Sequence, residues 1–64
     1  MRVYIVFEYE KYEYYDIRKV CDTQAKAEEH CQKATGVLIP NEDRIYSADK
    51  DCNCGYYWEN HEVR

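Results

Sequence analysis

Closely spaced pairs of metal ligands are scarce in this 64-residue sequence, which argues against a metal centre. There are four cysteines and two histidines, and only Cys52 and Cys54 lie close together. A structural zinc site needs four ligands, usually supplied as two close cysteine pairs. A single C-x-C pair does not meet that pattern, so we predict no metal site and no cofactor. The alternative is a zinc-stabilised minidomain, in which Cys52 and Cys54 are joined by ligands from Cys21, Cys31, His30 or His61.

The sequence also lacks an apolar run of the roughly 18 residues that a membrane helix needs. The opening "MRVYIVFEYE" turns acidic at Glu8 and has no small-residue cleavage site, so it does not resemble a secretory signal. We therefore expect a cytoplasmic protein with no membrane partner, in which thiols stay reduced and disulfides do not form. Cys21 and Cys31 fall at core-facing positions, where free cysteines pack as small hydrophobic residues.

Glycine is also rare, which argues against a catalytic site that depends on a glycine-rich loop. The two glycines are isolated, so the sequence has no glycine-rich loop to bind phosphate. A cysteine nucleophile needs a nearby base and an oxyanion hole, and no local motif joins a cysteine to a histidine. We also expect the chain to be too short to wall a substrate pocket of roughly 300 Å³ or more. These absences predict that the protein is not an enzyme.

Positive charge is the last shortage, since nine Lys and Arg stand against thirteen Asp and Glu and the net charge is −4. Proteins that bind nucleic acid gain affinity by placing Lys and Arg against phosphates. A protein that mimics DNA needs denser negative charge than acids scattered from Glu8 to Glu62. We therefore do not expect a nucleic-acid partner.

The sequence does contain clear strand patterns. In "RVYIVFEYE", residues Val3, Ile5, Phe7 and Tyr9 alternate with Tyr4, Val6, Glu8 and Glu10. Both sides carry apolar residues, which is typical of a central strand. "YYDIRKVC" resumes the alternation after a polar loop, but Lys19 falls on the apolar side. A β-bulge near Arg18 and Lys19 would remove that conflict.

A helix and a third strand follow. "DTQAKAEEHCQKATG" begins with Asp22 or Thr23 as a capping residue and ends at Gly36, the usual left-handed C-terminal residue. Its predicted buried face holds Ala27, His30, Cys31 and Ala34. Residues 36–55 form an irregular insert, with short extended pieces at 37–39 and 44–47, and "YYWENHEV" predicts the last main strand.

These elements predict one α+β domain over residues 1–64. The order is strand, strand, helix, strand (ββαβ), with an antiparallel sheet, the first strand in the middle and the helix packed on one face. One helix covers one face only. We expect the opposite face to carry Tyr4, Val6, Val20 and some of the C-terminal aromatic residues.

Tyrosine is the most over-represented residue, with eight Tyr and one Trp in the chain. Aromatic residues favour strands, which accounts for part of this excess. Tyr and Trp are also enriched in protein–protein interfaces, and stacking on nucleic-acid bases is a weaker possibility given the acidic charge. We therefore predict an interaction surface formed by Tyr4, Val6, Tyr12, Tyr14, Tyr15, Tyr56, Tyr57 and Trp58.

Three stretches, "RVYIVFEYE", "YYDIRKVCDTQAKAEEHC" and "YYWENHEV", resemble a family of small uncharacterised proteins found in bacteriophages and bacteria. The similarity covers roughly residues 1–35 and 56–63, and residues 36–55 depart from it. The resemblance implies a phage origin and a ββαβ fold, and it brings no known activity. By analogy with small phage proteins, we expect a non-enzymatic interaction module that inhibits or modulates a host or defence protein, or pairs with itself as a homodimer.

Overall fold

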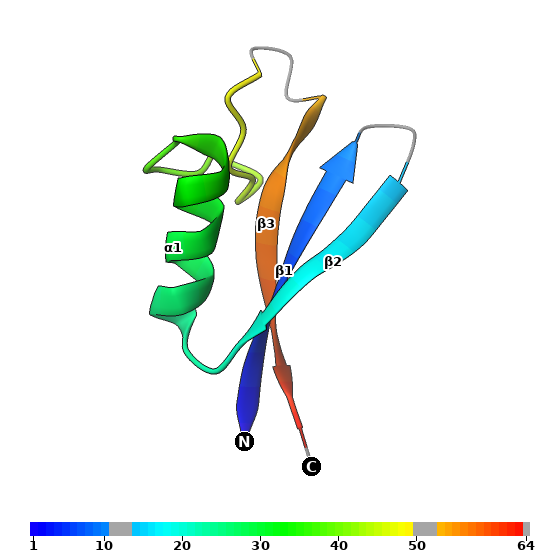
Figure 1. Ribbon diagram of the computed structural model, residues 1–64, viewed down its shortest axis with the longest axis vertical. Coiled ribbons are helices and arrows are strands. Elements are labelled where there is room, and N and C mark those ends of the chain that lie inside the picture. The colour runs from blue at the N-terminus through cyan, green and yellow to red at the C-terminus, as the bar shows by residue number, and fades with distance from the viewer. Residues whose placement is uncertain (11–13, 50–52, 64) are drawn as a thin grey trace.

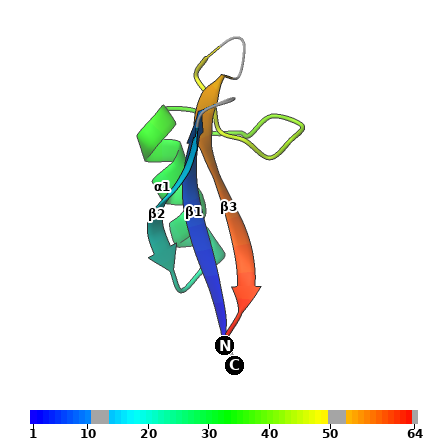
Figure 2. The same ribbon diagram turned by 90° about the vertical axis from the view of Figure 1, so that its right-hand side faces the viewer.

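The predicted topology is confirmed by the computed structural model, which describes residues 1–10, 14–49 and 53–63. Its elements are β1 (Arg2–Glu10), β2 (Tyr14–Cys21), α1 (Gln24–Thr35) and β3 (Cys54–Glu62). The three strands form one antiparallel sheet in the order β2-β1-β3, so that β1 is central, and α1 lies against one face of the sheet (Figure 1). Figure 2 shows α1 behind the sheet and the loop before β3 projecting beyond the edge of that strand.

The predicted β-bulge is present in β2. Val6 of β1 lies opposite Lys19 and Phe7 lies opposite Ile17, which leaves Arg18 as the extra residue. The Arg18 guanidinium donates hydrogen bonds to the Glu8 carboxylate, including one from Nε at 2.9 Å. The extra residue changes the alternation, so that apolar side chains of β2 on both sides of the bulge point to the same face of the sheet.

The ends of α1 have the capping interactions that the sequence predicts. Thr23 is the N-cap, and its Oγ1 accepts a hydrogen bond from the Lys26 backbone N–H at 3.2 Å. Gly36 ends the helix in the left-handed region with φ 74°, and its N–H donates to the Gln32 carbonyl at 2.7 Å. A side chain at φ 74° would be strained, so glycine is the residue that this turn favours.

The core lies between α1 and one face of the sheet. Its buried members are Val6, Cys21, Ala27, Cys31 and Tyr46, and Tyr4, Val37, Tyr56 and Trp58 pack against them partly buried. The buried side of α1 is narrower than predicted, because Ala27 and Cys31 are buried whereas Ala34 is exposed. With such small side chains on the helix, large residues from the sheet fill the space.

The expectation that Tyr4 and Val6 lie on the uncovered face is therefore wrong. Val6 is fully buried and Tyr4 packs on the same core. Since β1 is apolar on both sides, its alternation does not indicate which side the helix covers. The bulge brings Cys21 opposite Tyr4 and under the helix, and this fixes the covered side.

The irregular insert contributes to the core through Tyr46. Its backbone pairs with Tyr56 as an isolated antiparallel bridge, with N–H to carbonyl distances of 2.7 and 2.9 Å. A Cβ at Gly55 would lie 2.6 Å from the Tyr46 carbonyl oxygen, so this close approach requires glycine. β3 begins at Cys54, two positions before the predicted start at Tyr56.

Candidate functional site

The predicted interaction residues separate onto two sides of the sheet. Tyr15 and Tyr57 lie on the face away from α1, whereas Tyr4, Val6, Tyr56 and Trp58 lie on the helix side. Tyr12 lies outside the described residues, and for Tyr14 only the backbone is described. The eight residues therefore do not form one surface.

The face away from α1, called the helix-free face below, is apolar along β1 and β2. It is formed by Val3, Ile5, Phe7, Tyr9, Tyr15, Ile17, Val20 and Tyr57. Exposure is greatest on β2, where Tyr15 is 72% exposed and Ile17 and Val20 are each 58% exposed. Three large apolar side chains on neighbouring positions of one strand thus remain in contact with water.

Four aromatic rings pack against each other at one end of this face. Phe7 stacks on Tyr57 with ring centroids 5.0 Å apart, and Tyr9 stacks on Tyr15 at 6.2 Å. Tyr57 makes T-shaped contacts with both Tyr9 and Tyr15, with ring centroids 6.1 and 6.3 Å apart. Such stacked and edge-to-face pairs are favourable geometries, and they hold the rings in place without a partner.

Negative charge borders this cluster. Burial raises the pKa of the Tyr57 phenol, and the neighbouring Glu59 carboxylate and Tyr15 raise it further. Glu59 lies within hydrogen-bonding distance of His61, with 3.2 Å between Oε2 and Nε2. Glu59 is thus an acidic group beside the tyrosines, and it lies on β3 directly opposite Ile5 of β1.

Phe7 and Ile17 were not predicted as site residues. Their signal was present in the sequence, because the bulge that we expected near Arg18 places Ile17 and Val20 on one face with Tyr15. Phe7 belongs to the side of β1 that we had assigned to the core. Assigning the other side of β1 to the core would have identified Phe7 as a site residue.

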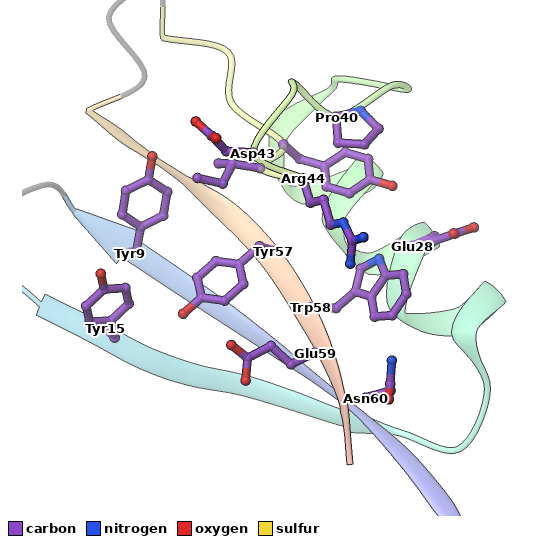
Figure 3. A pocket seen from close by; sticks show the side chains of 12 residues that line it. Tyr9, Tyr15, Glu28, Pro40, Asp43, Arg44, Tyr57, Trp58, Glu59 and Asn60 are labelled. Atoms are coloured by element: carbon purple, nitrogen blue, oxygen red, sulfur yellow. The ribbon is translucent and has the colours of Figure 1, made fainter.

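A groove of about 610 Å³ lies where the loop before β3 meets the edge of that strand (Figure 3). Tyr57 and Trp58 point to opposite sides of β3 and both line the groove, as do Pro40 and Arg44 from the loop. The expectation that so short a chain has no hollow of roughly 300 Å³ is therefore wrong. The groove runs along an open strand edge.

The cysteines divide into buried and exposed thiols. Cys21 and Cys31 are buried in the core, as predicted, and burial raises the pKa of the Cys31 thiol to about 11. A metal ligand or nucleophile must be a thiolate, so this shift works against both roles at Cys31. Cys54 is exposed, and Cys52 lies outside the described residues.

Neither a metal cluster nor a membrane-spanning helix is found where the chain is described. Over residues 1–10, 14–49 and 53–63, no group of three or more His, Cys, Asp and Glu side chains could hold a metal ion. No helix in the same ranges has the length and apolar character to cross a membrane.

Comparisons of the chain with protein families, with curated proteins and with solved structures find no match.

Proposed function

We propose that the protein is a non-enzymatic protein–protein interaction module that docks on its partner through the helix-free face. The observation that carries the proposal is the exposure of Tyr15, Ile17 and Val20, each more than half accessible, beside a cluster of packed aromatic rings. Contiguous exposed apolar surface of this kind is typical of interaction sites. Rings that already hold one another lose little conformational freedom on binding, which favours affinity.

The size of the face indicates what it can bind. β1 has nine residues, so at about 3.3 Å per residue and about 4.8 Å between strands the sheet face covers roughly 30 by 14 Å, or about 400 Å². A standard stable interface buries about 800 Å² on each partner. The helix-free face alone therefore supplies about half of such an interface. A partner that also contacts the flanks of the sheet completes it.

The partner that we propose is a host or defence protein in the cytoplasm, inhibited or modulated by this contact. Support comes from the resemblance of three sequence stretches to small phage proteins, and from the exposed apolar contact area of Tyr15, Ile17 and Val20. A homodimer through the same face is the second form of the proposal. Two copies that each carry −4 repel one another, which disfavours that form at low salt.

The test replaces an exposed apolar residue by a charged one. Ile17→Glu introduces a carboxylate into the centre of the exposed β2 patch, and Ala25→Glu adds the same charge on an exposed position of α1 as a control. Both variants should fold, with circular dichroism spectra and melting temperatures close to those of the unchanged protein, because both positions face water.

Association is then measured by light scattering after size exclusion and by affinity capture from host lysate. We expect the captured partner, or the dimer, to be lost with Ile17→Glu and kept with Ala25→Glu. Equal capture by both variants would contradict docking through the helix-free face. A protein that captures nothing and stays monomeric at high concentration would contradict the proposal as a whole.

A further inference from the structure

In the part of the chain that the structure describes, the outer edge of β3 beyond Tyr56 has backbone groups that no other strand pairs with. Tyr56 exchanges both of its backbone hydrogen bonds with Tyr46, which lies on the outer side of β3. Val63 is seven positions from Tyr56, and residues an odd number of positions apart on a strand point their backbone groups to opposite sides. The Val63 N–H accordingly donates to the Met1 carbonyl at 2.7 Å, on the β1 side. The pairing of β1 with β3 is continuous. Because the direction alternates along a strand, the N–H and C=O groups of Trp58 and Asn60 point outward as well.

Within residues 1–10, 14–49 and 53–63, no segment pairs with these outward positions. A strand continuing backward from Tyr46 would run beside Trp58, but the loop turns away first. Asn41 Oδ1 accepts hydrogen bonds from the backbone N–H groups of Asp43 and Ile45 at 2.9 and 3.0 Å. Arg44 has φ 67°, in the left-handed region, which ends any extended run. The groove opens where this fourth strand would continue (Figure 3).

The charges around the groove select among possible occupants. Three carboxylates, those of Glu28, Asp43 and Glu59, line it, and Arg44 is the one cation among its lining residues in the described ranges. The edge strand β3 itself contains Glu59 and Glu62 and no Lys or Arg. Pairing of two β3 edges from separate copies would therefore bring like charges together, which is unfavourable. The groove suits an occupant of opposite charge.

We propose that an extended segment of a partner protein, apolar and carrying Lys or Arg, adds to the free edge of β3 as a fourth strand along Trp58 and Asn60. Main-chain hydrogen bonds to these two residues provide affinity, and alternate side chains provide selectivity. Side chains on one side of the added strand lie beside Tyr57 and Glu59, where a cation meets both a carboxylate and an aromatic ring.

This edge site does not depend on docking through the helix-free face. Ile17 is not among the residues that line the groove, although Tyr15 and Tyr57 belong to both surfaces, and we expect Ile17→Glu to leave edge binding unchanged. The two proposals therefore fail separately. Loss of edge binding in Ile17→Glu would show that a single surface carries both functions and would overturn the edge site as an independent one.

The first probe is an acetylated and amidated peptide of alternating Val and Lys, compared with the same peptide carrying Glu in place of Lys. Trp58 is the only tryptophan and lies in the groove, so its fluorescence reports occupancy directly. Backbone amide shifts measured by NMR locate the bound peptide. We expect the Lys peptide alone to bind, with the largest shifts and new protection from hydrogen exchange at the amides of Trp58 and Asn60.

Two substitutions at one position separate backbone pairing from side-chain contact. Asn60→Ala and Asn60→Pro both remove the amide side chain, which accepts a hydrogen bond from Arg2 at 2.6 Å. Only Asn60→Pro also removes the outward N–H, and an edge strand tolerates proline where that N–H faces solvent. We expect Asn60→Pro to bind the Lys peptide about tenfold more weakly than Asn60→Ala.

Charge is tested by Glu59→Lys, which should abolish binding of the Lys peptide and allow binding of the Glu peptide. Folding of each variant is checked by its circular dichroism spectrum. Equal affinity of Asn60→Pro and Asn60→Ala, equal affinity for the two peptides, or shifts centred on Ile17 and Val20 would each overturn the edge site. So would the absence of any fluorescence change at millimolar peptide.

Discussion

The two faces of the sheet carry similar apolar residues but differ in how far those residues are buried. On the helix side, Val6 and Tyr46 are buried against small helix residues such as Ala27 and Cys31, and the side chains close a core. On the helix-free face, Ile17 and Val20 are equally apolar yet 58% exposed. Hydrophobic stabilisation is proportional to the apolar area removed from water. The helix side therefore stabilises the fold, and the helix-free face remains available for a partner.

The largest expected effect comes from placing the same charge on each face. Val6→Asp puts a carboxylate in the fully buried core, whereas Ile17→Asp puts one in water. Domains have about 0.05–0.15 kcal/mol of stability per residue, so this chain has about 3–10 kcal/mol, and an unpaired buried charge costs more than about 4 kcal/mol. We expect Val6→Asp to lose more than about 4 kcal/mol of stability, which unfolds the chain at the lower end of that range, and Ile17→Asp to change stability by less than about 0.5 kcal/mol, both measured by unfolding followed by circular dichroism. Comparable losses in both variants would contradict the difference between the faces.

A smaller effect, specific to the helix side, is the response to alkaline pH. The Cys31 thiol has its pKa raised from 9.0 to about 11, chiefly by burial. Below pH 9.0 the thiol is protonated in both folded and unfolded chains, and its contribution to stability is fully present. As pH rises toward 11 the unfolded chain loses this proton first, so the contribution is lost.

Urea unfolding at a series of pH values measures this loss. We expect the free energy of unfolding to fall by about 2 kcal/mol through Cys31 between pH 9 and pH 11. The raised pKa of Tyr46 adds a change of the same sign. Cys31→Ala should flatten the curve over this range, and Cys54→Ala, at an exposed position, should not. If Cys31→Ala leaves the slope of the unfolding free energy against pH unchanged, the Cys31 thiol is exposed to water and not buried.

The cap of α1 should contribute about 1 kcal/mol, the smallest of these effects. Thr23→Ala removes the side-chain oxygen that accepts the Lys26 N–H, and lost N-caps typically cost this amount. Thr23→Asn keeps an acceptor and should retain stability. Thermal unfolding of the pair measures the difference. If alanine and asparagine melt alike, the hydrogen bond from Lys26 does not stabilise the covering helix.

The features predicted correctly from the sequence are those with local causes. Thr23 and Gly36 end a helix for reasons contained within a few residues of each. The bulge at Arg18 follows from a polar residue interrupting an apolar alternation. The central place of β1 follows from its two apolar sides. Each of these signals can be read from neighbouring positions along the chain.

The features that the sequence did not predict depend on contacts between distant residues. Which side of β1 is covered depends on where α1 packs, and a strand that is apolar on both sides carries no mark of it. Tyr46 sits in an irregular segment, and its burial requires pairing with Tyr56 and a glycine at position 55. The groove arises between that segment and β3, so no single stretch of sequence indicates it.

One face of the sheet is closed by α1 within a single chain, whereas the other face exposes Tyr15, Ile17 and Val20 to water. Methyl relaxation by a soluble paramagnetic agent, measured by NMR on dilute protein, tests this difference directly. We expect the methyl groups of Ile17 and Val20 to be strongly relaxed and those of Val6 to be protected. Protection of Ile17 and Val20 in dilute protein, equal to that of Val6, would show that the chain covers both faces itself and would contradict the account.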